Sequence, residues 1–304
     1  MQLDAPLVFE ESDLTVTIVV CTRNRPALLR KCLEGIAQME RAPDEVLVVD
    51  NTSGDEETEA VARGFDATYT LEPVPGASRA RNRGLAESQS EIVAYLDDDA
   101  TPDVHWLGKL LEPFKDPHVA AVAGRVVTPQ SQVENSVRKT ALFLTNKDPK
   151  WFEIASFGGL ALASNMAFRR STCAGQRVFD ERLGRGAPFQ IGEEHYAFAL
   201  ILSRGYTACY LPDAIVFHPN PTRSEVKQEA RSSIAFTMVM FSEFPGSRLD
   251  LLRFLFHRMR RKPLTWPRDA PDPGEIVTSG WRVLLSASLS AALLFFRTRK
   301  PKCK

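Results

Sequence analysis

The chain has 304 residues, of which 44% are hydrophobic and 25% are charged, with a formal net charge of zero. These values are ordinary for a folded soluble protein and exclude a disordered or fibrous chain. The charge is uneven, because residues 253–304 hold 12 Lys/Arg and three Asp/Glu. A basic tail on an acidic body favours either an anionic partner, membrane or nucleic acid, or a simply solvated tail.

The five cysteines have no Cys-x-x-Cys spacing, so neither a zinc site nor a disulfide framework is indicated, and a reduced cytosolic compartment fits best. The first residues lack the basic and apolar regions of a signal peptide. The apolar run 283–296 is shorter than the roughly 20 residues that a membrane-spanning helix needs.

Strand and helix patterns alternate through the first third of the chain. Strands are predicted at 14–21, 45–49, 67–71 and 92–96, and helices from Pro26, over 55–65 and over 79–88. This alternation predicts parallel strands joined by crossover helices. Neither the Gly-x-Gly-x-x-Gly dinucleotide motif nor the P-loop motif is present.

Three consecutive aspartates, Asp97, Asp98 and Asp99, follow the apolar run 92–96. The run predicts a strand buried on both faces, and ligands of open α/β sheets lie beyond the carboxyl ends of such strands. In an extended segment Asp97 and Asp99 point to one side and Asp98 to the other. Because adjacent carboxylates repel, a cation such as a metal is expected beside them. An acidic turn that caps the next helix is the alternative.

The remaining two thirds of the chain show a less regular pattern. We predict a helix capped by Thr101 with Pro102 at its first position. The later elements are a strand at 119–127, a loop with one short helix at 128–149, a ligand-approaching glycine pair at 158–159, a helix from Glu193 to Gly205, strands at 208–211 and 215–217, helices at 224–241 and 247–261, a proline-rich linker at 263–274 and a last segment at 280–297.

Six motifs now stand in a specific order. They are Thr22-Arg23-Asn24-Arg25, Asp50, Ala80-Arg81-Asn82-Arg83-Gly84, the aspartate triplet, Asn165 to Arg170 and Gly192-Glu193-Glu194. This series, covering roughly residues 16–219, resembles the family 2 glycosyltransferases, which are inverting enzymes with the nucleotide-diphosphosugar transferase (GT-A) fold. The resemblance implies an α/β fold with a mixed, mostly parallel sheet flanked by helices. It also implies a catalytic domain over 1–222, with a nucleotide-sugar half (14–127) and an acceptor half (128–222), followed by a helical, basic extension over 223–304.

The resemblance assigns donor-side roles to residues of the first half. Thr22, Asn24, Arg25 and Asp50 match positions that hold the nucleotide base, although Asp50 could instead form an Asx turn. The other matches are Arg81 as a diphosphate or nucleotide contact, Asp97 on the nucleotide sugar, Asp98 near the ribose, and Asp99 on a divalent metal, Mg²⁺ or Mn²⁺. His218 matches a position where some members have a second metal ligand, and a structural histidine is the alternative.

Glu194 matches the catalytic base that deprotonates the acceptor hydroxyl, with Glu193 in reserve. The family usually has Asp where this chain has Glu194, so the carboxylate is displaced by about one C–C bond. Either glutamate also suits the first turn of a helix for electrostatic reasons alone. Asn165, Arg169 and Arg170 match a region that lines the sugar or acceptor side.

The resemblance implies transfer of one sugar from a UDP, GDP or dTDP sugar to a hydroxyl of a glycan or lipid-linked glycan. A sugar nucleotidyltransferase would need a Gly-rich loop after the first strand, which residues 22–26 lack, and a non-catalytic scaffold is the other alternative. Apolar and basic residues in the extension favour peripheral binding to an anionic membrane over packing on the catalytic domain, with a cytoplasmic location and no nucleic-acid partner.

Overall fold

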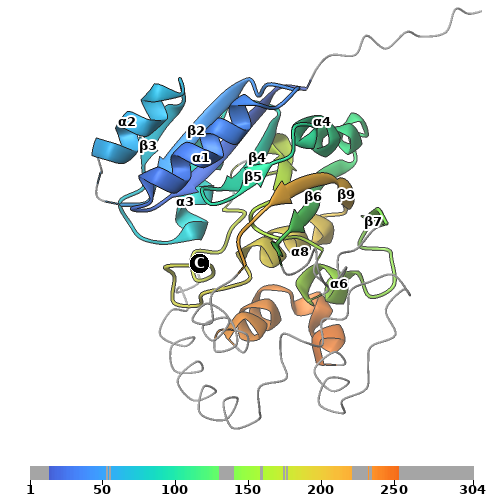
Figure 1. Cartoon of the computed structure of the whole chain (residues 1–304). Coiled ribbons are helices and arrows are strands. Elements are labelled where there is room, and N and C mark those ends of the chain that lie inside the picture. The colour runs from blue at the N-terminus through green and yellow to red at the C-terminus, as the bar shows by residue number, and fades with distance from the viewer. Residues whose placement is uncertain are drawn as a thin grey trace, which may run out of the picture.

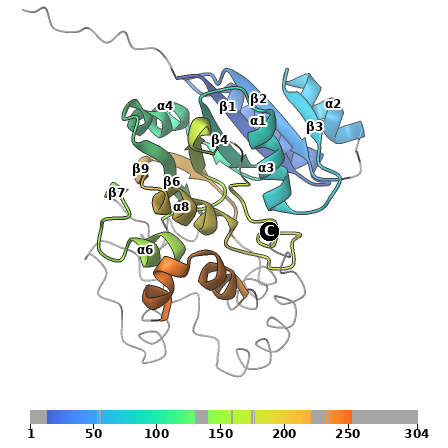
Figure 2. The ribbon, with the colours of Figure 1, turned by 180° about the vertical axis from the view of Figure 1, so that it is seen from behind.

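A computed structural model describes residues 14–52, 54, 56–129, 140–157, 160–173, 175, 177–220, 232 and 235–252. Its centre is one nine-stranded mixed sheet with helices on both faces, as Figure 1 shows and Figure 2 shows from behind. The strand order is β3-β2-β1-β4-β8-β6-β9-β5, and β7 also pairs with β9. The α/β class and the mostly parallel sheet are as predicted.

The first half of the sheet is a parallel α/β unit. Its elements are β1 (Val16–Thr22), α1 (Pro26–Ala37), β2 (Glu45–Asp50), α2 (Glu56–Gly64), β3 (Thr68–Leu71), α3 (Ala77–Glu87) and β4 (Ile92–Asp97). β1 lies between β2 and β4, and all three run in one direction. Each boundary lies within two residues of the prediction, because the apolar periodicity and the turn residues agree along this stretch.

The second half of the sheet is mixed. Its elements are β5 (Thr101–Pro102), α4 (Trp106–Leu111), η1 (Glu112–Lys115), β6 (Val119–Val127), β7 (Leu142–Leu144), α6 (Trp151–Phe157), β8 (Met166–Arg169), α7 (Arg170–Cys173), α8 (Glu193–Ser203), β9 (Thr207–Phe217) and η2 (Pro245–Ser247). β8 runs antiparallel to both β4 and β6 and joins the two halves.

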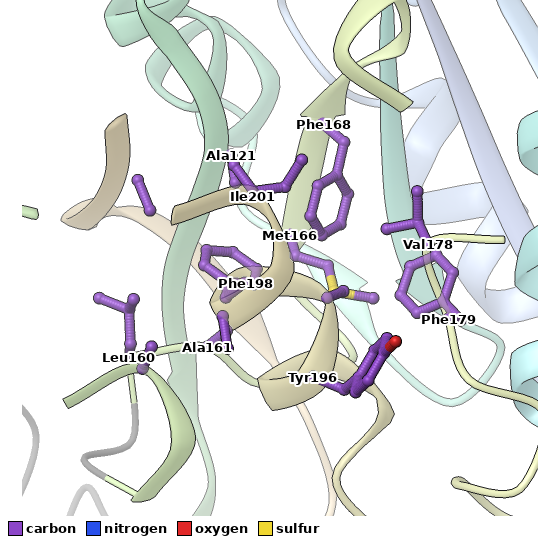
Figure 3. Packing of buried hydrophobic residues seen from close by; sticks show 14 of the residues in the cluster. Ala121, Leu160, Ala161, Met166, Phe168, Val178, Phe179, Tyr196, Phe198 and Ile201 are labelled. Carbon is purple, nitrogen blue, oxygen red and sulfur yellow. The ribbon is translucent and has the colours of Figure 1, made fainter. Parts of the chain in front are cut away.

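Two apolar layers cover the sheet, because its strands are buried on both faces. One layer packs α1, α2 and α4 against side chains such as Ile18 and Val48. The other packs α3, α6 and α8 against side chains such as Val19 and Val93. Figure 3 shows the second layer at close range, where Phe168 of β8 meets Phe198 of α8 edge-on, with ring centroids 5.3 Å apart.

Three of the predicted elements differ in the structure. Thr101 and Pro102 form the short strand β5 rather than a helix start, because the edge of β9 supplies hydrogen-bond partners to them and to Asp103. The two strands predicted at 208–211 and 215–217 are the single strand β9, whose irregular middle is a register shift opposite β6. The region predicted as a loop with a helix contains β7; its residues 130–139, like the glycine pair at 158–159, lie outside the described residues.

The described part of residues 223–304 packs on the preceding part of the chain. Residues 235–243 are helical, and Phe236 and Phe244 contact the aromatic rings of Phe157 and Phe152, respectively. For this stretch, packing was the less favoured prediction and is the arrangement found. Membrane association of residues 253–304, which lie outside the described residues, stays a prediction. Within the described residues, no helix has the length and apolarity needed to cross a bilayer.

Gly84 sets the close approach of α3 to β1. A Cβ at this position would lie 2.4 Å from Val19 Cγ1 and 3.0 Å from Val19 Cγ2. Gly84→Ala should therefore cost about 1–3 kcal/mol of unfolding free energy through overpacking. Gly108→Ala in α4, where a Cβ meets nothing within 4 Å, should instead be neutral or slightly stabilising. Denaturant titration of both variants tests this, and equal stability of the two would contradict it.

Candidate active site

Polar side chains end three neighbouring parallel strands at one edge of the sheet. Thr22 ends β1 beside Asp50, which ends β2, while Cys21 of β1 pairs in register with Asp97, which ends β4. Because the carboxyl ends of parallel strands meet at one edge of the sheet, these residues lie side by side and line a candidate ligand site.

Asp97 and Asp99 form a cluster with His218, which follows β9. The three side chains offer ligand atoms that all lie within 4.8 Å of one another. His218 Nε2 lies 3.0 Å from Asp99 Oδ1 and 4.0 Å from Asp97 Oδ2. Two carboxylates and an imidazole are suitable ligands for a divalent metal such as Mn²⁺, so the donor set fits a metal ion.

His218 is oriented for this cluster from its other ring nitrogen. Its Nδ1 lies 2.8 Å from the carbonyl oxygen of Pro219, so this nitrogen donates and Nε2 faces the carboxylates. Such second hydrogen bonds orient metal-bound histidines. Burial favours the neutral ring, but the hydrogen bond to Asp99 outweighs it and raises the pKa of His218. Burial likewise opposes ionisation of Asp99, yet His218 and Arg25 lower its pKa to about 2.

Asp98 points away from this cluster, as predicted, although residues 98 and 99 form a turn after β4 and not the extended segment on which the prediction was based. It is fully buried, accepts a hydrogen bond from Thr22 Oγ1 at 2.6 Å and pairs with Arg25 Nη2 at 2.5 Å. Burial raises its pKa to about 6 despite these two partners. Arg25 also reaches Asp99 Oδ2 at 3.0 Å. Asp98 therefore holds the loop after β1 through Thr22 and Arg25, and its predicted contact with the ribose stays a prediction.

Asp50 is buried, and its two carboxylate oxygens differ in whether they accept a hydrogen bond. Its Oδ2 accepts from the Tyr69 hydroxyl at 2.8 Å, whereas its Oδ1 has no hydrogen-bond partner among the described residues. A buried acceptor without a partner costs about 1–3 kcal/mol, so this oxygen is suited to a donor that arrives with a ligand. Asn51 shapes the adjoining loop, donating to the carbonyl oxygens of Glu72 and Val74.

Arg81 lies at the centre of the site rather than on its surface. It is 5% exposed, and its guanidinium pairs with Glu193 Oε1 at 2.8 Å and with Asp97 Oδ1 at 3.1 Å. It thereby joins α3 to β4 and α8. The resemblance implies a diphosphate or nucleotide contact here, whereas the partners of Arg81 in the structure are carboxylates.

Glu193 and Glu194 open α8 after Gly192, whose φ is +89°. Burial, together with the neighbouring Glu194, raises the pKa of Glu193. Glu194 lies 3.2 Å from His195 Nδ1, and this cation outweighs burial and lowers the pKa of Glu194. The two glutamates thus differ in their partners, because Glu193 pairs with Arg81 and Glu194 pairs with His195.

Asn24 and Asn165 both lie near this edge of the sheet, but they differ in burial. Asn24 is exposed in the loop after β1, with a φ of +55°. Asn165 is fully buried, accepts from Trp106 Nε1 and donates to the carbonyl oxygens of Arg125 and Ala214. These contacts hold the bulge of β9 against β6, so Asn165 supports the fold beside the site.

Arg169 and Arg170 are not brought to the site. Arg169 pairs in register with Ile92 at the start of β4, the opposite edge from Asp97. Its guanidinium donates to the carbonyl oxygens of Val119, Phe114 and Asp116, and Arg170 Nε donates to that of Ser90. The resemblance placed both arginines in a region that lines the sugar or acceptor side, but their side chains donate to backbone carbonyls instead.

Residues 177–191 and His195 lie in the predicted acceptor half, but no individual role is predicted for them. The segment lies against α3, where Asn82 Nδ2 donates to the Phe179 carbonyl and Ser78 Oγ to that of Leu183. The sequence signal that could have indicated this segment is the pair of closely spaced glycines Gly184 and Gly186, both of which have positive φ.

The model of the family described as glycosyl transferase family 2 matches residues 17–183, and the chain belongs to this family. This confirms the resemblance that the six motifs indicated.

Known relatives agree with that assignment. The N-acetylglucosaminyltransferase of Rhizobium meliloti (strain 1021) is 26% identical over 249 residues, 75% of this chain and 58% of that protein. The succinoglycan biosynthesis protein ExoM of the same strain is 30% identical over 232 residues, covering 73% and 70% of the two chains. The chain thus spans little more than half the length of the first relative.

A mannosyltransferase from Pyrobaculum calidifontis, PcManGT, has been solved in complex with GDP-Man and Mn²⁺. It shares 20% sequence identity and a TM-score of 0.60 with this protein, over 92% of this chain and 80% of that one. This likeness confirms the predicted fold.

Proposed function

We propose that this protein is an inverting, metal-assisted glycosyltransferase that moves one sugar from a nucleotide diphosphosugar to a hydroxyl group. The observation that carries the proposal is the Asp97, Asp99 and His218 cluster, which lies at the sheet edge that also holds Asp50. The name of one relative, a succinoglycan biosynthesis protein, supports a glycan as acceptor, and a lipid-linked glycan is the other form of acceptor that we propose.

Asp50 and the loop shaped by Asn51 suit the base of the nucleotide. The free oxygen of Asp50 would accept an N–H from the edge of a pyrimidine or guanine ring, which satisfies a buried acceptor. Tyr69 orients this carboxylate from its other oxygen. The choice among UDP, GDP and dTDP then depends on which ring places its N–H at Asp50.

Asp97, Asp99 and His218 would hold Mg²⁺ or Mn²⁺. When bound, such an ion neutralises negative charge that develops on the diphosphate as the sugar leaves. Arg25 binds Asp98 and Asp99 together, so it fixes the geometry of the loop that carries these ligands.

Glu194 is the residue we assign as the base. In a single displacement, the acceptor oxygen forms a bond to the anomeric carbon while the bond to the diphosphate oxygen breaks, and the hydroxyl proton passes to Glu194. The lowered pKa keeps Glu194 ionised at neutral pH, as a proton acceptor must be, although it also makes the carboxylate a weaker base. Glu193 is held by Arg81 and by contact with Gly184, where a Cβ would lie 3.0 Å from Glu193 Cδ.

Glu194→Gln is expected to lower turnover by about 10²–10⁴-fold while leaving donor affinity unchanged, because it removes only the proton acceptor. Release of nucleoside diphosphate from UDP, GDP and dTDP sugars, with Mn²⁺ or with EDTA, measures turnover, and calorimetry measures affinity. Glu194→Asp, which restores the residue usual in the family, should recover part of the activity. Full activity of Glu194→Gln would remove Glu194 from the mechanism, and no turnover by the wild type with any donor would favour the scaffold alternative.

A further inference from the structure

A helix over residues 235–243 lies against the start of α8, which carries Glu193 and Glu194. This part of the chain is drawn in orange in Figures 1 and 2, beside α6 and α8. The ring of Phe236 packs edge-on against Phe157 of α6, with ring centroids 5.7 Å apart, and Phe236 is only 4% exposed. A residue that comes long after the two glutamates in the sequence is therefore buried beside them in the fold.

Phe236 contacts the residue at which α8 begins. Its ring lies so close to Gly192 that a Cβ there would be 2.6 Å from Phe236 Cε2 and 2.9 Å from Phe236 Cγ. Gly192 also has a φ of +89°, a conformation that side chains other than glycine rarely adopt. The ring thus packs directly on the backbone that leads into Glu193 and Glu194.

Phe236 also contacts the side chain that pairs with the proposed base. The imidazole of His195 lies edge-on to the Phe236 ring, with ring centroids 6.1 Å apart, and His195 Nδ1 lies 3.2 Å from Glu194 Oε1. Glu193 is held instead by Arg81 of α3. The two carboxylates are therefore positioned from different elements, and the helix that carries Phe236 supports the partner of Glu194.

Polar contacts join this helix to the segment that precedes α8. Arg182 Nη2 pairs with Glu243 Oε1 at 2.6 Å and with Asp180 Oδ2 at 2.5 Å. The backbone N–H of Gln190 donates to Ser232 Oγ at 3.1 Å. Glu243 ends the helix and Ser232 precedes it, so these contacts hold both ends of the helix and fix its aromatic ring relative to α8.

We infer that Phe236 is a positioning residue for the transfer reaction. Its ring sets the start of α8 and the imidazole of His195, and it thereby places the Glu194 carboxylate for the acceptor hydroxyl. Close placement matters because a displacement of about 1 Å can cost about 100-fold in rate. The inference rests on the proposed function, which assigns Glu194 as the base. Residue 236 lies outside the six motifs and outside residues 17–183, which the family model matches.

Steady-state kinetics of Phe236→Leu test the inference, with release of nucleoside diphosphate from UDP, GDP and dTDP sugars to water as the readout. Leucine stays apolar but lacks the ring, so kcat should fall about 10- to 100-fold. The affinity for UDP, GDP or dTDP with Mn²⁺, measured by calorimetry, should change less than about twofold, because the donor side of the site is untouched.

Phe244→Leu is the matched control. Phe244 is also buried and follows the same helix, but its ring packs on Phe152 and Tyr196. The variant should lower the temperature of thermal unfolding to a similar extent as Phe236→Leu and keep the kcat of the wild type. If Phe236→Leu fails to fold, Phe236→Met, which retains more of the side-chain length, provides the same comparison.

A double variant separates positioning from folding. In the Glu194→Gln background, Phe236→Leu should lower the remaining kcat by less than about twofold, because the carboxylate that the ring places is already gone. A further 10- to 100-fold loss in that background would overturn the inference. Unchanged kcat in Phe236→Leu, or equal kcat losses in Phe236→Leu and Phe244→Leu, would overturn it as well.

These three outcomes would leave the proposed function standing. Full activity of Glu194→Gln would overturn both the inference and the assignment of the base, since Phe236 acts through Glu194. Failure of the wild type to release nucleoside diphosphate from any of these donors would overturn the inference together with the proposed function.

Discussion

Replacing Asp99 by asparagine is expected to lower turnover at least about 100-fold and to abolish the effect of Mn²⁺ on nucleotide binding. Asparagine keeps the shape of the side chain but removes one of the two carboxylates of the metal cluster. Removing one preorganised electrostatic group from an active site typically costs 10²–10³ in rate. Nucleoside diphosphate release and calorimetry, each with Mn²⁺ and with EDTA, measure the two effects.

Asp213→Asn is the matched control for this substitution. Asp213 is an exposed residue of β9, the strand that leads to His218, so the variant makes the same chemical change on the same sheet. It should retain wild-type turnover and metal dependence. If Asp99→Asn stayed as active and as metal-dependent as Asp213→Asn, the assignment of Asp99 as a metal ligand would be wrong.

Replacing Arg81 by methionine is expected to have the largest effect on stability, about 3–5 kcal/mol of unfolding free energy. The change removes the shared cation and leaves Glu193 buried and Asp97 partly buried without it. Breaking a buried ion pair from one side costs this much because an uncompensated charge remains. Urea or guanidinium titration measures the loss, and activity should fall as well because Arg81 positions both carboxylates.

Two further variants isolate the cause. The double variant Arg81→Met, Glu193→Gln should recover part of the lost stability, since one of the two orphaned charges is gone. Arg83→Met lies two residues away on α3 and removes a half-exposed partner of Glu87, so it should cost less than about 1 kcal/mol. Equal stability of Arg81→Met and Arg83→Met would show that the buried network contributes nothing to folding.

The sequence predicts the parallel half of the fold well, because local signals there agree with the tertiary arrangement. The apolar run before Asp97 predicts both β4 and the position of the acidic triplet at the sheet edge. The predicted separation of Asp98 from Asp97 and Asp99 is found, but a turn at residues 98 and 99 produces it and not the alternation of an extended strand. Local signals fail where tertiary contacts determine the secondary structure. Thr101 and Pro102, for example, pair with the edge of β9 instead of capping a helix.

The candidate site is predictable where a motif lies at a strand end and less so elsewhere. Asp50, Asp99 and His218 have positions that follow from their strands. Arg169 lies in one of the motifs, but it pairs in register with Ile92, which places it at the edge of the sheet opposite to Asp97. The partners of Arg81 come from β4 and α8, and only the folded chain reveals that it bridges these elements.

We expect a nucleoside diphosphate to bind through a metal held by Asp97, Asp99 and His218. The most direct test is calorimetric titration of the wild type with UDP, GDP and dTDP, each with Mn²⁺ and again with EDTA. We predict that one of the three binds with Mn²⁺ and that EDTA removes this binding. Binding of none of them in either condition, or equal binding with and without the metal, would contradict the claim.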